Sequence, residues 1–139
     1  MGSDGAGEVI QVGDKVTKFK IGDRVATNFY QDHNSGPLTV KAAQSALGSL
    51  KDGAFREYAV ISEKGLVHVP RNYSWRQAAS LPCVAVTAWN ALFGDRKITA
   101  GDTVLIQGTG GVSLFALEVR FLPDQSSRDS NCVQSLPKL

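Results

Sequence analysis

An apolar run that leads directly into a glycine-rich turn limits the possible folds of this chain more than any other stretch. Residues 103–107 read Thr-Val-Leu-Ile-Gln, and residues 108–113 read Gly-Thr-Gly-Gly-Val-Ser. A short apolar run of this kind is typical of a strand that is buried on both faces of a parallel sheet. Residues 114–122 can form a helix that stops before Pro123. We therefore expect a strand, a tight turn and a helix, in that order.

The spacing of the glycines is typical of a turn that binds the pyrophosphate of a dinucleotide. In such a turn, the backbone amides at the start of the helix point at the phosphates. Gly108 would make the tight turn, and Gly110 would let the backbone approach the phosphates. Ser113 occupies the third position, where Gly or Ala is usual, and serine is small enough for the helix to pack closely on the strand. An ordinary strand-to-helix loop is the alternative interpretation.

The same pattern places a residue that selects NAD or NADP about 20 positions further on, at the end of the next strand. The count leads to Asp129, but the residues around it, Ser-Arg-Asp-Ser-Asn, lack the pattern of a buried strand. Asp129 is better interpreted as a solvated acid. Residues 123–139 hold four serines and two prolines and show no period of 2 or 3.6 residues. We expect this tail to be disordered and to contribute no strand.

The first 70 residues favour β structure over helix. Short runs rich in β-branched residues alternate with Gly-Asp turns, which is typical of a small barrel or sandwich. One stretch, residues 41–50, can form a short helix. The expected strands cover residues 8–12, 22–26, 55–61 and 66–69.

Two helices are expected between the β-rich part and the glycine turn. Ser74 followed by Gln77 is a plausible capping box, which opens a helix that runs to Leu81. Residues 84–93 form a second helical run, with apolar residues at spacings of three and four.

The composition is that of a globular chain and excludes several classes of function. Hydrophobic residues make up 42% of the 139 residues and charged residues 20%. The net charge of +2 comes from scattered basic residues and does not suggest a nucleic-acid groove. No apolar run approaches the roughly 20 residues that span a bilayer. The N-terminus lacks a secretory pattern, and the two cysteines suggest no disulfide framework, so we expect a cytoplasmic protein without nucleic-acid or membrane partners.

Three motifs in one order resemble the medium-chain dehydrogenase/reductase superfamily, and most of all its zinc-type alcohol dehydrogenase-like and quinone oxidoreductase branch. Residues 12–25 resemble part of its GroES-like barrel, residues 78–92 the helix that joins the barrel to the nucleotide domain, and residues 101–113 the first strand and glycine turn of the Rossmann domain. The resemblance covers about residues 4–118. It implies a mixed α and β fold, in which a partial GroES-like barrel precedes the first β-turn-α unit of a Rossmann domain.

The resemblance also implies domain bounds and a chemistry. Residues 1–83 would be the partial GroES-like domain, residues 84–122 the linker helix and the start of the NAD(P)-binding domain, and residues 123–139 the disordered tail. The superfamily transfers a hydride between NAD or NADP and a small alcohol, carbonyl or quinone-like substrate. No catalytic residue can be named from the sequence. The implied cofactor-binding residues are Thr87, Gly108, Thr109, Gly110, Gly111, Val112 and Ser113.

The zinc ligands of the metal-using relatives are not reproduced here. Their ligand before Gly-Ala-Gly is a histidine, and Ser3 stands in its place, while Cys83 matches another ligand position. One candidate cannot hold a catalytic zinc, which takes about three protein ligands. We therefore expect no zinc, and a packing role for Cys83.

The two histidines are interpreted separately. His68 follows Val67 in an alternating run and is expected to face the surface. His33 lies in a loop near the position where the family binds substrate, and both a solvated residue and a substrate contact remain open.

The resemblance starts partway into the barrel and stops partway along the first Rossmann helix, so we expect an incomplete form. Such a chain would bind the cofactor weakly or not at all and would be weakly active or inactive, since its parallel strand would lack neighbours. The alternative is a non-catalytic fragment or an interaction module built on the barrel. The oligomeric state cannot be predicted from the sequence.

Overall fold

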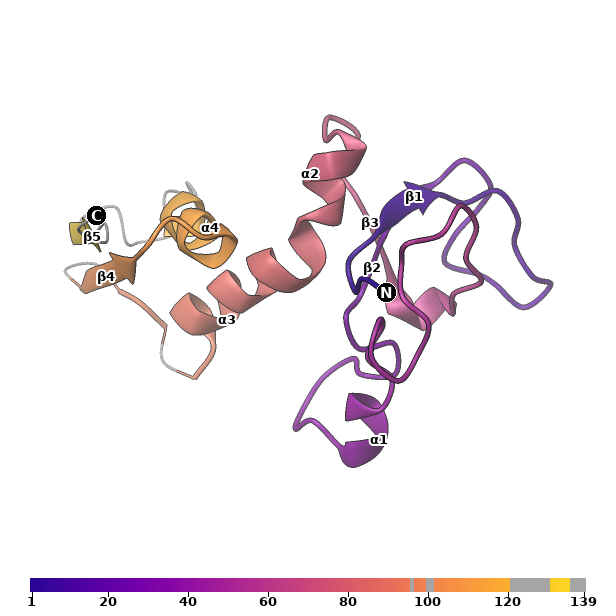
Figure 1. Cartoon of the computed structure of the whole chain (residues 1–139), viewed down its shortest axis with the longest axis horizontal. Helices are drawn as coiled ribbons and strands as arrows, with labels where there is room; N and C mark the ends of the chain where they lie inside the picture. The colour runs from indigo at the N-terminus through magenta and orange to yellow at the C-terminus, as the bar shows by residue number, and fades with distance from the viewer. Residues whose placement is uncertain (96, 100–101, 121–130, 136–139) are drawn as a thin grey trace. The chain divides into compact units, whose positions relative to one another are not determined.

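The computed structural model describes residues 1–95, 97–99, 102–120 and 131–135. The chain divides into two compact units, Met1–Cys83 and Val84–Leu139. The described part combines helices with short strands, so the expected mixed α and β class is confirmed (Figure 1).

The first unit is built on a three-stranded antiparallel sheet with the order β1-β2-β3. The strands are β1 (Ala6–Glu8), β2 (Arg24–Thr27) and β3 (Leu66–His68). The central strand β2 pairs Val25 with Gly7 on one side and with His68 on the other. Three consecutive residues of β2 are buried, as befits a central strand: Val25, Ala26 and Thr27.

A small core forms where helix α2 (Trp75–Ala79) covers this sheet. Ala26, Val69 and Ala78 are its buried members, and Tyr73 packs against them. The expected capping box is present, because the Ser74 amide donates to Gln77 Oε1 and the Ser74 hydroxyl accepts from the Gln77 amide. This cap starts the helix, and the small Ala78 lets it approach the sheet closely.

Helix α1 (Val40–Ala43) is shorter than the run expected over residues 41–50. The hydroxyl of the buried Ser45 donates to the Ala42 carbonyl and accepts from the Asp32 amide at 2.9 Å. The chain then leaves the helix and forms an isolated antiparallel bridge between Ala46 and Tyr30. Contacts with a distant segment thus override the helical propensity.

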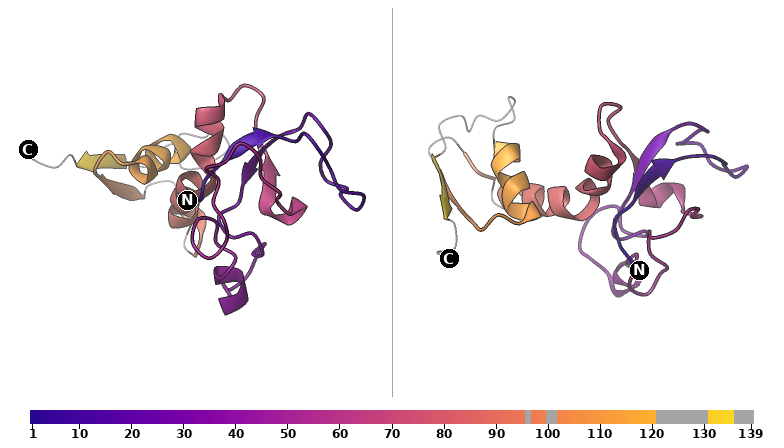
Figure 2. Two further views of the ribbon diagram at one scale, coloured as in Figure 1. Left: turned by 45° about the vertical axis from the view of Figure 1, so that its right-hand side comes forward. Right: turned by 45° about the horizontal axis from the view of Figure 1, so that its top comes forward.

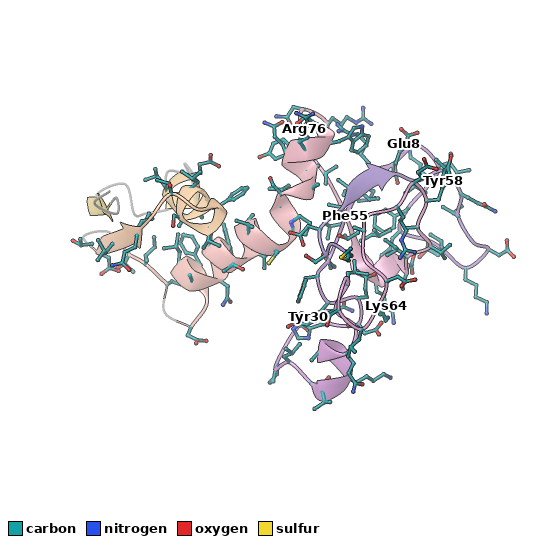
Figure 3. All side chains as sticks on the ribbon, in the orientation of Figure 1. Glu8, Tyr30, Phe55, Tyr58, Lys64 and Arg76 are labelled. Carbon is teal, nitrogen blue, oxygen red and sulfur yellow. The ribbon has the colours of Figure 1, made fainter. Side chains whose placement is uncertain are left out.

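The strand expected over residues 55–61 is absent, and this expectation is wrong. No described strand pairs with the segment, although aromatic and β-branched residues, which favour strands, occur in it. Phe55 and Tyr58, both labelled in Figure 3, are 80% and 74% exposed. A segment of this composition becomes a strand only beside a neighbour that completes its hydrogen bonds.

The second unit contains helices α3 (Val86–Phe93) and α4 (Gly111–Arg120) and strands β4 (Thr103–Gln107) and β5 (Asn131–Ser135). A π-helical turn, Leu81–Ala85, leads into α3, and α4 packs against both α3 and β4. The two strands pair in parallel, from Thr103 with Asn131 to Gln107 with Ser135, and lie side by side in both views of Figure 2. Together they form a β4–α4–β5 unit.

Strand β5 corrects the expectation that residues 123–139 form a disordered tail without a strand. Asn131–Ser135 pair with β4 along its whole length. The rest of that tail, Asp129 included, lies outside the described residues. Strand β5 has five residues, of which one is aliphatic, so its hydrophobic periodicity is too weak to predict a strand. Its pairing depends on β4, which is distant in sequence.

Strand β4 has the expected bounds but is buried on one face only. Ile106 is 5% exposed, whereas its neighbour Leu105 is 60% exposed. The expectation of burial on both faces is therefore wrong for the described residues, because no described helix covers the face that carries Leu105. Within the part of the chain that the structure describes, no helix is long and apolar enough to cross a membrane.

Candidate functional site

The glycine turn lies between the carboxyl end of β4 and the first residue of α4. Strand β4 ends at Gln107 and α4 begins at Gly111, so residues 108–110 make the whole connection. Gly108 has a φ of 82°, a backbone conformation that strongly favours glycine. The tight turn expected at this residue is confirmed.

Two glycines of the turn, Gly108 and Gly110, have open space where another residue type would carry its side chain. A Cβ atom built on Gly108 or on Gly110 would meet no other atom within 4 Å. Neither glycine is therefore required by close packing within the described chain. A side chain at Gly110 would instead fill the space in front of the helix, which a ligand could use to approach the backbone.

Gly111 differs from these two glycines because it is required by packing. A Cβ atom on Gly111 would lie 3.0 Å from Cγ1 of Val84, which is closer than ordinary contact. Glycine at position 111 allows Val84, which precedes α3, to lie against the first turn of α4.

The first turn of α4 offers the electrostatic features of an anion site. The Leu114 amide donates to the Gly110 carbonyl at 3.1 Å and so closes the first helical turn. The amides that precede it have no acceptor within the helix, and Gly110 has no side chain that could cap them. The first turn contains no acidic residue, so no carboxylate neutralises the positive end of the helix dipole.

Ser113 has a second role besides its small size. Its hydroxyl donates to the Gln107 carbonyl at 2.8 Å and so joins the first turn of α4 to the last residue of β4. This bond fixes the two sides of the glycine turn relative to each other. The sequence showed that the third position of the motif is polar, but it could not show that the Gln107 carbonyl accepts the hydrogen bond of Ser113.

The other expected cofactor-binding residues lie on or beside this turn. Thr109 and Val112 are exposed within it. Thr87 is exposed on the first turn of α3, the helix that packs against α4. The structure thus gathers residues 108–113 at one place and puts Thr87 on the adjacent helix. These residues suit a dinucleotide phosphate group, because backbone amides, a glycine cradle and an uncompensated helix end occur together.

The residues present do not suit a catalytic zinc. Among the described residues, no group of three or more His, Cys, Asp or Glu side chains is placed to hold a metal ion. The Ser3 hydroxyl donates to the Asp4 carboxylate at 2.8 Å, and Cys83 is exposed. We derive no chemical step from a metal here.

The two histidines have ordinary structural contacts. His68 is exposed in β3, as expected, and its ring lies 4.7 Å from that of Phe19. His33 is half-buried and approaches the edge of the Tyr30 ring at 6.3 Å.

A cavity of about 490 Å³ in the first unit was not expected from the sequence. Two ion pairs lie at its wall, Lys51 with Asp32 at 3.2 Å and Arg56 with Asp52 at 3.4 Å. Each of the two cations thus has a carboxylate partner. Its walls come from segments too far apart in sequence for any motif to reveal them.

Comparison with known proteins agrees with this fold. Residues 1–71 match the family model of the alcohol dehydrogenase GroES-like domain. The chain therefore belongs to the medium-chain dehydrogenases/reductases that carry this domain. The matched residues include all three strands of the sheet β1-β2-β3 and helix α1.

Individual relatives extend the similarity beyond the matched domain. A zinc-type alcohol dehydrogenase-like protein of Schizosaccharomyces pombe is 50% identical over 119 residues, which cover 84% of this chain and 34% of the relative. A quinone oxidoreductase of Pseudomonas aeruginosa is 37% identical over 119 residues, which cover 85% of this chain and 30% of the relative. The crystal structure of a putative alcohol dehydrogenase from Sinorhizobium meliloti superposes with a TM-score of 0.82 at 36% identity and covers 95% of this chain and 38% of that one. The chain thus spans about a third of the length of these curated relatives.

Proposed function

We propose that residues 108–113 bind the pyrophosphate of NAD(H) or NADP(H) in an oxidoreductase that acts on a small alcohol, carbonyl or quinone-like substrate. The observation that carries the proposal is the open Gly108–Gly110 turn at the start of α4, which has no acidic residue in its first turn and lies beside two parallel strands. Ligands bind at the carboxyl ends of parallel strands in sheets of this kind.

Each part of the proposed site has its own task. The amides of the first turn of α4 hold the pyrophosphate, and the bond from Ser113 to Gln107 keeps them in place. Thr87 lies beside the nicotinamide, as the family resemblance implies. The bound cofactor supplies the hydride chemistry, and the protein positions the reacting groups. We propose no catalytic residue.

The domain assignment that supports this function is also a proposal. Residues 1–83 correspond to the GroES-like domain, and residues from 84 onward correspond to the linker helix and the start of a Rossmann domain. The β4–α4–β5 unit supports this assignment, because two parallel strands joined through a helix are the building block of that domain. With two described strands and one exposed sheet face, this chain by itself should bind the cofactor weakly.

A thermal shift experiment tests the proposal. A ligand that binds only the folded state at about ten times its Kd stabilises that state by about 1.4 kcal/mol. We expect NADPH or NADH to raise the Tm of the chain at millimolar and not at micromolar concentration. Gly110→Val should abolish the shift, because its side chain fills the space in front of α4.

Gly13→Val is the matched control for this experiment. A Cβ atom on Gly13 also meets nothing within 4 Å, and its φ is unexceptional, but Gly13 lies outside the second unit. The control should keep the Tm shift of the unmodified chain. Absence of a shift with either cofactor up to about ten millimolar, roughly the range in which weak sites fill, would contradict the proposal.

A non-catalytic interaction module is the second candidate. The observation that favours it is the apolar surface of the segment with Phe55 and Tyr58, which a protein partner could cover (Figure 3). This candidate requires no cofactor, so a chain with no Tm shift would favour it.

A further inference from the structure

The backbone of residues 57–61 has no hydrogen-bond partner within the described part of the chain. None of its amides donates to a described residue, and none of its carbonyls accepts from one. The flanking backbone bonds run from the Arg56 amide to the Ala54 carbonyl and from the Gly65 amide to the Ser62 carbonyl. Between these bonds the chain runs from Tyr58 to Ser62 without a helix, a turn or a bend. The segment is thus an extended chain with an unpaired edge, to which another strand can pair.

The side chains of residues 57–61 favour such pairing and lie in water. Tyr58, labelled in Figure 3, is largely exposed, and Val60 is fully exposed. Tyrosine and valine are both enriched in strands. Glu57 is the only charged residue of the segment, and it contains no lysine or proline, the residues that commonly protect a strand edge from pairing. Free backbone groups and exposed apolar side chains therefore occur together on one short surface.

The segment is complementary to a second copy of itself. Two identical strands related by a two-fold axis run antiparallel, and the residue on the axis pairs with its own copy. The free backbone runs from residue 57 to residue 61, so Ala59 is its midpoint. With Ala59 on the axis, Tyr58 lies opposite the partner's Val60, and Val60 lies opposite the partner's Tyr58. Pairs of an aromatic and a β-branched residue are among the cross-strand pairs that stabilise sheets.

Charge and backbone bonding both favour this register over its two neighbours. With Val60 on the axis, Glu57 would lie opposite the partner's Glu63, and like charges in opposite positions are destabilising. With Tyr58 on the axis, the pairing would extend to residues whose amides already donate within their own chain. The register with Ala59 on the axis has neither fault.

We propose that this chain forms a weak dimer in which residues 57–61 of two copies pair as antiparallel strands. The second copy supplies the neighbour that completes the hydrogen bonds of the segment. The inference does not depend on the cofactor site, which lies in the other unit. Five paired residues in each copy make a small interface beside the roughly 1,600 Å² of a standard complex, so we expect a Kd of about 0.1 mM.

Sedimentation equilibrium of the full chain, without cofactor, tests the inference at concentrations from about 10 μM to about 1 mM. We expect the weight-average mass to rise with concentration towards twice that of one chain. Val60→Lys should raise the Kd by about tenfold or more, because it places a charge on the pairing edge. Val40→Lys is the matched control, since Val40 is an exposed valine of the same unit that lies in α1. This control should keep the Kd of the unmodified chain.

A mixture of two variants tests the register. Tyr58→Glu alone should weaken association as Val60→Lys does. An equimolar mixture of the two should regain a Kd close to that of the unmodified chain, because the register with Ala59 on the axis places the new carboxylate opposite the new ammonium group. Both side chains are exposed, so circular dichroism melts should show that each variant folds.

Three outcomes would overturn the inference. The first is a chain that stays monomeric at about 1 mM, roughly ten times the expected Kd; a different partner would then cover the segment. The second is an equal loss of association in Val60→Lys and Val40→Lys, which would place the interface on another surface. The third is a mixture of Tyr58→Glu and Val60→Lys that associates no better than either variant alone.

Discussion

Arg24 shows how much of the first unit depends on a single side chain. Its two terminal nitrogens donate to the carbonyls of Arg71 at 2.7 Å and of Tyr73 at 2.6 Å. Its guanidinium carbon lies 4.0 Å from the centre of the Trp75 ring. One residue of β2 thereby holds the chain that leads into α2. Lysine could not form this planar, forked set of bonds.

We predict that Arg24→Lys lowers the free energy of unfolding by about 2 kcal/mol, because two charge-assisted hydrogen bonds and a stacked contact are lost. Urea denaturation of the variant measures the change. Arg76→Lys, on the exposed side of α2, is the control and should leave the unfolding midpoint unchanged (Figure 3). Equal effects of the two substitutions would show that the forked contact contributes nothing.

The sequence predicted the glycine turn well, but it did not predict the contacts of Arg24. The conformation of Gly108 follows from its place between a strand and a helix, which are adjacent in sequence. Arg24 instead reaches acceptors 47 and 49 residues away. Local sequence cannot reveal such partners, because they depend on how distant segments fold together.

At the level of elements, the carboxylate of Glu63 joins two loops of the first unit. Its Oε2 accepts from the amide of Thr17 at 3.0 Å and from that of Lys18 at 3.1 Å. These two backbone hydrogen bonds hold the pKa of the Glu63 carboxyl below its usual range, and the cation of Lys18 contributes in the same direction. The segment around Thr17 is thereby attached to the short helix Glu63–Gly65 that precedes β3.

The lowered pKa of Glu63 predicts the direction of a pH effect. A carboxyl whose pKa is lower in the folded chain stabilises the fold at pH values above the pKa of the unfolded chain, about 4.3. That stabilisation is lost as the pH falls through the lower pKa of the folded state. Glu63→Gln should therefore reduce the fall in Tm between neutral and acidic pH, whereas Glu57→Gln, at an exposed residue, should not. An unchanged pH profile in Glu63→Gln would refute this role.

Elements whose signals are local were predicted best. The capping box of Ser74 and Gln77 and the bounds of β4 depend on neighbouring residues, and both are confirmed. The missing strand at residues 55–61 and the additional strand β5 depend on whether another strand lies alongside. Pairing of this kind is a tertiary property, so the sequence pattern predicted one strand too many and one too few.

For the molecule as a whole, the presence of β5 changes what the second unit can do. A strand and helix alone would leave the glycine turn at the end of an unpaired strand. The parallel partner gives β4 a neighbour and brings a second strand end to the turn. The glycine turn could be predicted because its motif is contiguous, whereas the pairing of β5 with β4 joins segments that are separated in the sequence.

The central claim is that the amides at the start of α4 hold a pyrophosphate. Titration of the ¹⁵N-labelled chain with NADPH, followed by amide NMR spectra, observes those groups directly. We predict saturable shifts for the amides of Gly110 to Ser113, and none in Gly110→Val. Saturable shifts confined to other residues, or spectra unchanged at millimolar cofactor, would contradict the account.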